Sequence, residues 1–168
     1  MRKNICMLSN PDVLRNNAKN RKKEFEVLIR KLKKLKSRKI DLLFHSLHEE
    51  AFTEIHCLEC ANCCRGLGPG INSSDITRLS AFLKIKEADL MKKYIITDED
   101  GDYVFRESPC PFLMEDNYCS VYVSRPKACR EYPHTNQKNI KSILTVCLEN
   151  TKTCPAVYYI FQEIPKHL

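Results

Sequence analysis

The sequence predicts a mostly helical α+β protein, in which an N-terminal helical hairpin precedes a small, irregular cysteine-rich domain with short β-hairpins. Apolar residues recur at helical spacing in the first third of the chain and again near its end. Short apolar runs separated by polar turns, which favour β-hairpins, lie between these helical segments. Ten cysteines in 168 residues favour a domain organised by cysteine chemistry, and 43% hydrophobic residues indicate a globular chain.

Charge is distributed unevenly along the chain. The first forty residues contain 14 Lys or Arg and 3 Asp or Glu, whereas the remainder contains 14 and 18. The length suits one domain with an extension. We therefore expect a basic helical extension over residues 1–37 and a cysteine-cluster domain over residues 38–168.

The extension is expected to form a single helix over residues 11–36. Its apolar residues follow a 3.6-residue period, which Arg21 interrupts once. Pro11 suits the first turn, and Asn10 can cap it because an Asn side chain accepts backbone N–H groups that have no partner inside the helix. A second helix, over about residues 38–54, would complete the hairpin.

The elements expected after the hairpin are shorter. A helix should begin at Ser73, followed by apolar residues at helical spacing. A β-hairpin is expected where the turn at residues 98–101 separates residues 95–97 from residues 103–105. The remaining expected elements are a helix over residues 86–94, a second hairpin joining residues 111–114 to residues 118–121, and a helix over residues 156–163.

Cysteine usage also predicts a compartment. The first residues lack the apolar region of a secretory signal, and no run of about 18 apolar residues predicts a membrane span. We therefore expect a cytoplasmic protein, whose reduced thiols bind metal rather than form disulfides. The sequence contains no phosphate-loop, HExxH or GxSxG motif, so the enzyme classes that depend on them are not expected.

The strongest functional signal is a CxxCxxCC run formed by Cys57, Cys60, Cys63 and Cys64. C-x2-C is a zinc-ligand spacing, and C-x2-C-x2-C occurs in bacterial-type iron–sulfur sites. Neighbouring side chains diverge on most backbones, so the adjacent pair could serve two metals or bridge between them. A glycine-rich loop, residues 66–70, follows the run and could bring backbone N–H groups close to a thiolate.

Further cysteines extend this pattern. Cys110 and Cys154 each precede a proline, as in the Cys-Pro that closes ferredoxin-type runs. Cys6 lies in the N-terminal tail, and Cys147 lies in a stretch with helical character, so both are set aside. Eight cysteines remain, enough for two four-coordinate sites: the run of four together with Cys110, Cys119, Cys129 and Cys154.

Three stretches resemble one family in their order and spacing: CLECANCCRGLGPGINSSDITRLSAFL, SPCPFLMEDNYCSVYVSRPKACREYPH and a late CP. Over about residues 40–160 they are similar to the YkgJ-type cysteine-cluster proteins, which are described as zinc- or iron-chelating domains. The family often has glycine where this chain has Ala61. The resemblance implies metal binding by Cys57, Cys60, Cys63, Cys64, Cys110, Cys119, Cys129 and Cys154.

The metal stays open between zinc and an iron–sulfur cluster, because tetrahedral all-thiolate sites suit both. The two-residue spacings favour a cluster slightly, and we expect 4Fe–4S rather than 2Fe–2S if a cluster is present. A metal that only folds this small domain is as compatible with the sequence as a functional one. A cluster would favour electron transfer or redox sensing, tuned by the glycine-loop amides and Arg130.

Polar residues near the cysteines allow other interpretations. Arg125, Tyr132 and His134 could line the substrate groove of a metal- or cluster-dependent enzyme that modifies a protein or peptide. We prefer a role in which such residues support the thiolates through hydrogen bonds. His45 and His48 lie one turn apart, and we expect them on a solvated helix face rather than in a metal site.

The basic extension gives a third interpretation, a zinc-folded adaptor that docks a protein partner through this helix. The basic helix could also bind RNA, DNA or an anionic surface, but we prefer a solvated helix that keeps the protein soluble, and nucleic-acid binding is not favoured. Phe25 is its only aromatic residue, so stacking on bases is not indicated.

Overall fold

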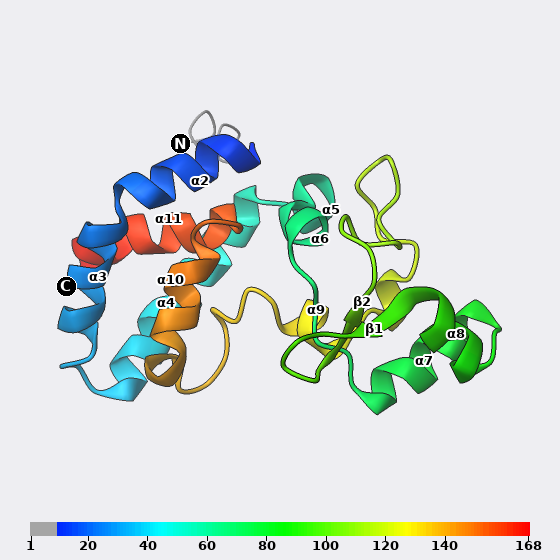
Figure 1. The fold of residues 1–168 in the computed structure, drawn as a ribbon. Coiled ribbons are helices and arrows are strands. Elements are labelled where there is room, and N and C mark those ends of the chain that lie inside the picture. The colour runs from blue at the N-terminus through cyan, green and yellow to red at the C-terminus, as the bar shows by residue number, and fades with distance from the viewer. Residues whose placement is uncertain (1–9) are drawn as a thin grey trace. The chain divides into compact units, whose positions relative to one another are not determined.

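The computed structural model describes residues 10–168, and its contacts divide the chain into two compact units (Figure 1). The first unit comprises the described part of Met1–His56 together with Pro133–Leu168, and the second is Cys57–Tyr132. Helices dominate, and one two-stranded sheet is present among the described residues, which confirms the mostly helical α+β class. The boundary expected after residue 37 was based on the distribution of charged residues, whereas the two units are defined by the contacts between residues.

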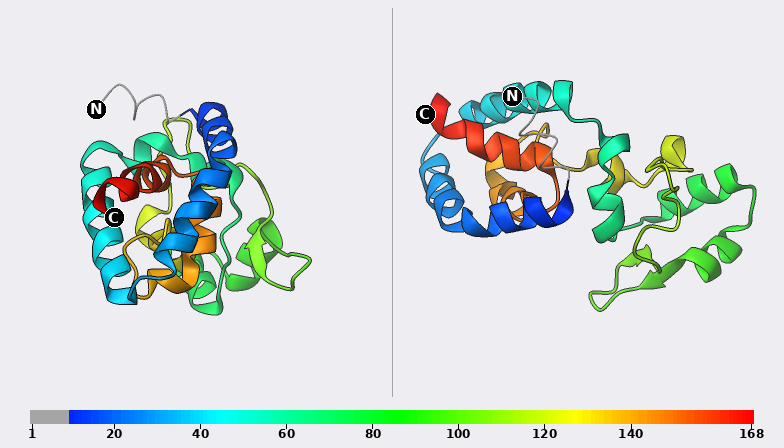
Figure 2. Two further views of the ribbon diagram at one scale, coloured as in Figure 1. Left: turned by 90° about the vertical axis from the view of Figure 1, so that its left-hand side faces the viewer. Right: turned by 90° about the horizontal axis from the view of Figure 1, so that it is seen from above.

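The first unit is a helical bundle built from both ends of the chain. Figure 2 shows α11 lying between α4 and the α2–α3 pair, an arrangement seen in both of its views. Its elements are α2 (Pro11–Asn20), α3 (Lys22–Leu32), α4 (Ser37–Glu54), η2 (Ile140–Ile143), α10 (Leu144–Asn150), α11 (Pro155–Glu163) and η3 (Ile164–His167). The helices expected over residues 38–54 and 156–163 are confirmed.

The single helix expected over residues 11–36 is wrong, because the helix breaks at Arg21. This residue has φ −96° and ψ 5°, and α3 then ends at Leu32. A continuous helix would place the guanidinium on the apolar stripe. At the break it binds the Glu24 carboxylate, with Nε 2.8 Å from Oε2, and covers the Phe25 ring at 4.9 Å. The expected Asn10 cap is confirmed, since its Oδ1 accepts the N–H of Val13 at 3.2 Å.

The core of the bundle forms around an aromatic cluster that includes the C-terminal helix. The ring of Phe161 lies 5.2 Å from that of Phe25 and 6.1 Å from that of Phe44, both in edge-on geometry. All three side chains are fully buried. The apolar stripe of the basic helices is therefore covered by residues more than a hundred positions later in the chain.

The second unit contains short elements around a smaller core. Its elements are α5 (Cys57–Cys60), α6 (Asn62–Gly66), α7 (Ser73–Leu83), α8 (Glu87–Tyr94), β1 (Ile95–Thr97), β2 (Tyr103–Phe105), η1 (Tyr122–Ser124) and α9 (Lys127–Glu131). The first predicted hairpin is confirmed, because β1 and β2 pair antiparallel with Ile96 opposite Val104. Asp98 Oδ1 holds the turn by accepting the N–H of Asp102 at 2.8 Å.

One further expectation in this unit is confirmed and another needs correction. The helix α7 begins at the predicted Ser73, after the cap residue Asn72, which forms a reciprocal capping box with Asp75. The second hairpin is reduced to an isolated bridge between Leu113 and Cys119. Pro111 cannot donate to a strand ladder, and the N–H of Leu113 bonds the carbonyl of Cys110 at 3.0 Å in a turn.

In residues 10–168, the helices are too short or too polar for any of them to cross a membrane.

Candidate metal centre

Four of the expected ligands lie on two short helices at the start of the second unit. Cys57 and Cys60 begin and end α5, and Cys63 and Cys64 lie within α6. Ala61 joins the two helices in the left-handed conformation, with φ 50°, which glycine adopts most easily. A tight turn therefore forms here with an alanine, where the family often has glycine.

Cys64 lies at the electrostatic centre of the cysteines in this unit. Its Sγ is 3.9 Å from that of Cys63, and a hydrogen bond between them, helped by the Arg65 guanidinium, lowers the pKa of Cys64 to about 7 despite burial. Charge at Cys64 adds to burial in raising the pKa of five other cysteines. These are Cys57, Cys60, Cys110, Cys119 and Cys129. Because such effects weaken with distance, all five lie within electrostatic range of Cys64.

Backbone N–H groups support three of these sulfurs. The N–H of Asn62 bonds Cys60, that of Phe112 bonds Cys110, and that of Val121 bonds Cys119, each lowering the pKa of its cysteine against the larger effect of burial. At each sulfur one donor lies two residues after the cysteine, and at Cys110 the N–H of Leu113 adds a second. At all three sulfurs the N–H donors offset part of the cost that burial imposes on the thiolate, the form that metal ligands require.

Turns bring the segments that carry these cysteines together. The N–H of Cys110 bonds the carbonyl of Cys64 at 2.8 Å, across 46 positions of sequence. The bridge between Leu113 and Cys119 joins the turn after Cys110 to the turn after Cys119. The carbonyl of Cys119 accepts the N–H of Tyr122 at 3.1 Å. The expected glycine loop is not the source of the sulfur donors at Cys60, Cys110 and Cys119.

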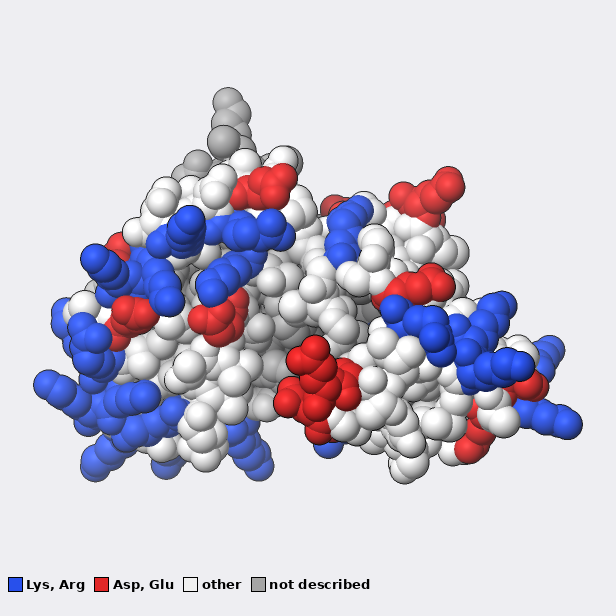
Figure 3. Space-filling view, viewed as in Figure 1, with Lys and Arg blue, Asp and Glu red and all other residues white. Residues whose placement is uncertain are grey.

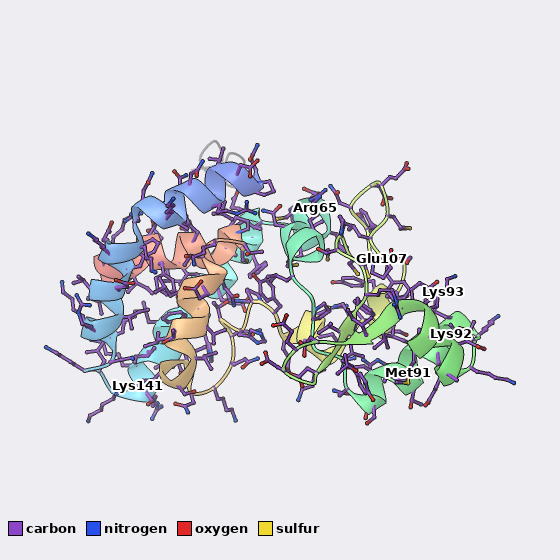
Figure 4. The ribbon with its side chains drawn as sticks, viewed as in Figure 1. Arg65, Met91, Lys92, Lys93, Glu107 and Lys141 are labelled. Carbon is purple, nitrogen blue, oxygen red and sulfur yellow. The ribbon has the colours of Figure 1, made fainter. Side chains whose placement is uncertain are left out.

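Two arginines supply positive charge to the cysteines. Arg65 lowers the pKa of Cys60 and Cys64, although burial is the larger effect at Cys60. Its Nη1 also donates to the carbonyl of Cys60 at 2.9 Å, and Figure 4 shows it on α6. Sequence reasoning missed Arg65, although its place directly after the CC pair could have indicated it.

Arg125 has the same effect at Cys57, Cys119 and Cys129, where burial again dominates and raises the pKa of each thiol. Its guanidinium carbon lies 3.8 Å from the centre of the Tyr122 ring, and its Nη1 donates to the Tyr122 carbonyl at 2.8 Å. These contacts hold the charge in place, as expected of a residue that supports thiolates.

A buried carboxylate anchors the helix that carries Cys129. It lies on α9, and burial, followed by the charge at Cys64, raises its pKa to about 12. The first residue of α9, Lys127, donates its backbone N–H to Oδ1 of Asp75 at 3.0 Å. Asp75 is 1% exposed, so this bond connects α9 to α7 within the core of the unit.

Two cysteines belong to the first unit. Cys154 is 8% exposed and is the N-cap residue of α11, where its N–H bonds the carbonyl of Asn150 at 2.8 Å. Cys147 is fully buried in α10, and burial raises its pKa to about 12. The remaining cysteine, Cys6, falls outside the described residues.

The nine cysteines between residues 10 and 168 form no disulfide. In the same range, no three Cys, His, Asp or Glu side chains are positioned to hold one metal ion. Most cysteines of the second unit are only half-buried, and Cys57 is exposed. The donor set itself, sulfur with backbone and arginine support, suits zinc and iron.

The other polar residues considered from the sequence are spread over both units. Arg130 is exposed on α9, and Tyr132 is half-buried at the end of this helix. His134 belongs to the first unit, with φ 69°, and its Nδ1 is 2.8 Å from Nε2 of Gln137.

The solvated helix face expected for His45 and His48 is wrong. His48 Nδ1 is 2.8 Å from the hydroxyl of Thr135, and His45 Nε2 is 2.8 Å from the carbonyl of Gln137. Both imidazoles are half-buried. They fasten α4 to the segment that follows residue 132, a contact that helix periodicity cannot reveal.

The fold and the site define a small, mostly helical, cysteine-rich protein in which backbone N–H groups bond several cysteine sulfurs. A sequence model of one family matches residues 56–148, more than half of the chain. The chain belongs to this family, CxxCxxCC, which carries the description "Putative zinc- or iron-chelating domain". The match contains seven of the eight expected ligands and Cys147, and it ends before Cys154. Comparisons with curated proteins and with solved structures found no match.

Proposed function

We propose that this protein chelates zinc or iron through a thiolate centre in its second unit, with Cys64 among the ligands. The backbone N–H groups at Cys60, Cys110 and Cys119 carry this proposal. A thiol that serves only as a small apolar side chain gains little from such donors. The proposed ligand pool is Cys57, Cys60, Cys63, Cys64, Cys110, Cys119 and Cys129, with Cys154 from the first unit as the eighth member.

The size of the pool supports more than one metal site. A tetrahedral site uses four thiolates, and the second unit alone contributes seven. Two centres, or one centre with bridging cysteines, would use them. Because reduced thiols of this kind persist in a reducing compartment, we also propose that the protein works in the cytoplasm.

Zinc and a cluster differ in what they would supply. Zinc would fix the loops of this small unit without redox chemistry. A 4Fe–4S cluster would add one-electron redox chemistry, and the N–H groups that face the sulfurs, together with Arg65 and Arg125, would raise its reduction potential. A redox role is therefore our second candidate, and it depends on iron.

Elemental analysis of protein purified without oxygen, together with a visible spectrum and a sulfide assay, tests the proposal. Iron with acid-labile sulfide and a brown colour would support a cluster, and colourless protein with one or two zinc ions would support zinc chelation. Protein that holds neither metal after purification and after anaerobic reconstitution would overturn it.

Two matched variants identify the ligands. Cys64→Ala should lower the metal content per chain, whereas Cys147→Ala should leave it unchanged, because Cys147 is outside the proposed ligand pool and is fully buried within α10. Equal loss of metal from both variants would contradict the proposed ligand pool.

A further inference from the structure

One surface of the first unit gathers positive charge far beyond the rest of the bundle. The stretch from residue 27 to residue 40 contains no Asp or Glu. Figure 3 shows its Lys and Arg side chains massed around the end of α3 and the start of α4. We call this surface the basic corner, and its seven cationic residues are Arg30, Lys31, Lys33, Lys34, Lys36, Arg38 and Lys39. All seven are exposed.

The charges of the basic corner have no acidic partners within the described residues. The ion pairs of α2 and α3 there involve Arg15, Arg21 and Lys22, all of which precede the corner. Asp41 carries the first carboxylate after the corner. Its two oxygens accept backbone N–H groups, that of Asn139 at 3.0 Å and that of Ile140 at 2.9 Å, rather than a cation of the corner. Seven like charges in ten residues repel one another, and a polyanion would relieve that repulsion.

The basic corner is also held in shape. Leu32 and Ile40, on either side of the turn, are fully buried. Lys141, which Figure 4 places at this turn, donates its Nζ to the carbonyl of Leu35 at 2.9 Å. The backbone between α3 and α4 is thus fixed from the inside while its cations stay in solvent.

We propose that the basic corner binds the phosphate backbone of a double-stranded nucleic acid without reading its sequence. Phosphate contacts need cations and little else, and their affinity comes from the release of counterions. No aromatic residue occurs between residues 26 and 43, so the corner has no platform on which the bases of a single strand could stack. A duplex presents its phosphates at the surface and does not require one.

The structure disfavours two other anionic partners. An amphipathic helix binds a membrane by inserting its apolar face, but the apolar face of α3, including Phe25 and Leu28, is buried in the bundle. A protein interface is anchored by buried aromatic and aliphatic side chains. The large exposed apolar side chains next to the corner are Val27 at 42% and Leu42 at 62%, both aliphatic.

Fluorescence anisotropy with labelled duplexes of about 20 base pairs, one DNA and one RNA of the same sequence, tests the proposal over roughly 50 to 200 mM salt. The key variant is K31Q/K33Q/K34Q/K36Q in the full chain. The control is K84Q/K86Q/K92Q/K93Q, which removes the same charge from exposed lysines of the second unit. Far-UV circular dichroism establishes that both variants fold.

Wild type should bind with a steep salt dependence, and the corner variant should lose at least about tenfold in affinity and show a shallower salt slope. The control should stay within about twofold of wild type. Preference for DNA or RNA would identify the source of the phosphates. Equal losses in both variants, no duplex binding at low salt, or tighter binding to phosphatidylserine vesicles or polyglutamate than to either duplex would overturn the proposal.

Discussion

Asp75 and Lys127 are 52 positions apart, yet Oδ1 of Asp75 accepts the backbone N–H of Lys127 at 3.0 Å. The same oxygen accepts Nη2 of Arg78 at 2.5 Å, and this Nη2 also donates to the carbonyl of Arg125 at 3.0 Å. Both residues that flank Pro126 are thus bonded to α7. The arrangement fixes the backbone that carries Arg125 and leads into Cys129.

Asp75→Asn should lower the free energy of unfolding by roughly 2–4 kcal/mol, because the buried Arg78 contact loses its charged partner. Chemical denaturation followed by circular dichroism measures this loss. Glu99→Gln, in the exposed hairpin turn, is a control that should change stability by less than about 0.5 kcal/mol. A stability change for Asp75→Asn no larger than the control's would show that the bonds at Asp75 are not structural.

Arg125→Gln should weaken metal binding by roughly 10–100-fold, as is typical for groups that support metal ligands. The reason is the loss of positive charge near Cys57, Cys119 and Cys129. Competition against a chromophoric chelator measures the affinity. Arg130→Gln removes the same charge from an exposed position on α9 and should have little effect. If both variants weaken binding alike, general charge rather than the placement of Arg125 is responsible.

Phe161→Ala should lower the stability of the helical bundle by roughly 3–5 kcal/mol, because it removes a buried ring that contacts Phe25 and Phe44. Thermal unfolding monitored at the helical signal measures the effect. Phe82→Ala, on the exposed face of α7 with 43% of its side chain accessible, is the matched control and should cost much less. A small effect at Phe161 would mean that α11 is not a core helix.

Acidification should destabilise the helical bundle through His48, whose pKa is lowered mainly by burial. A folded pKa below the unfolded value means that the unfolded state binds more protons, so this contribution to stability is complete above about pH 6.5 and is lost as the pH falls through the folded pKa. Urea unfolding between about pH 7.5 and 5 measures the slope. His48→Gln should reduce it, whereas His167→Gln, exposed near the C-terminus, should not. An unchanged slope in His48→Gln would assign the pH dependence to other groups.

Local structure was predictable wherever a local cause sets it. The Asn10 cap, the helix over residues 38–54 and the β1–β2 hairpin follow from side chains and backbone groups within a few positions of each other. The family, too, is carried by the spacing of the cysteines. These features survive because the same short-range interactions exist in almost any tertiary setting.

The predictions that were wrong concern features determined by contacts between segments far apart in the sequence. The apolar periodicity predicted one helix that continues through Arg21. Leu14 and Phe25 on that helix face are both buried in the core, so the charged guanidinium of Arg21 cannot lie on the same face between them. The second hairpin gave way to turns that present N–H groups to Cys110 and Cys119. The sequence predicted a solvated face for His45 and His48. In the structure, the segment after residue 132 lies against α4 and contacts both imidazoles.

By itself, the sequence determined the cysteine pattern, the charge of the first forty residues and most helices, since each is a property of neighbouring residues. The tertiary structure decided that Cys64 lies within electrostatic range of five other cysteines, that Arg65 and Arg125 supply their positive charge, and that Asp75 holds α9. These depend on distances between segments dozens of positions apart. Such distances arise only when two cores bury their apolar side chains, because that burial, and not the local pattern, determines where the chain returns.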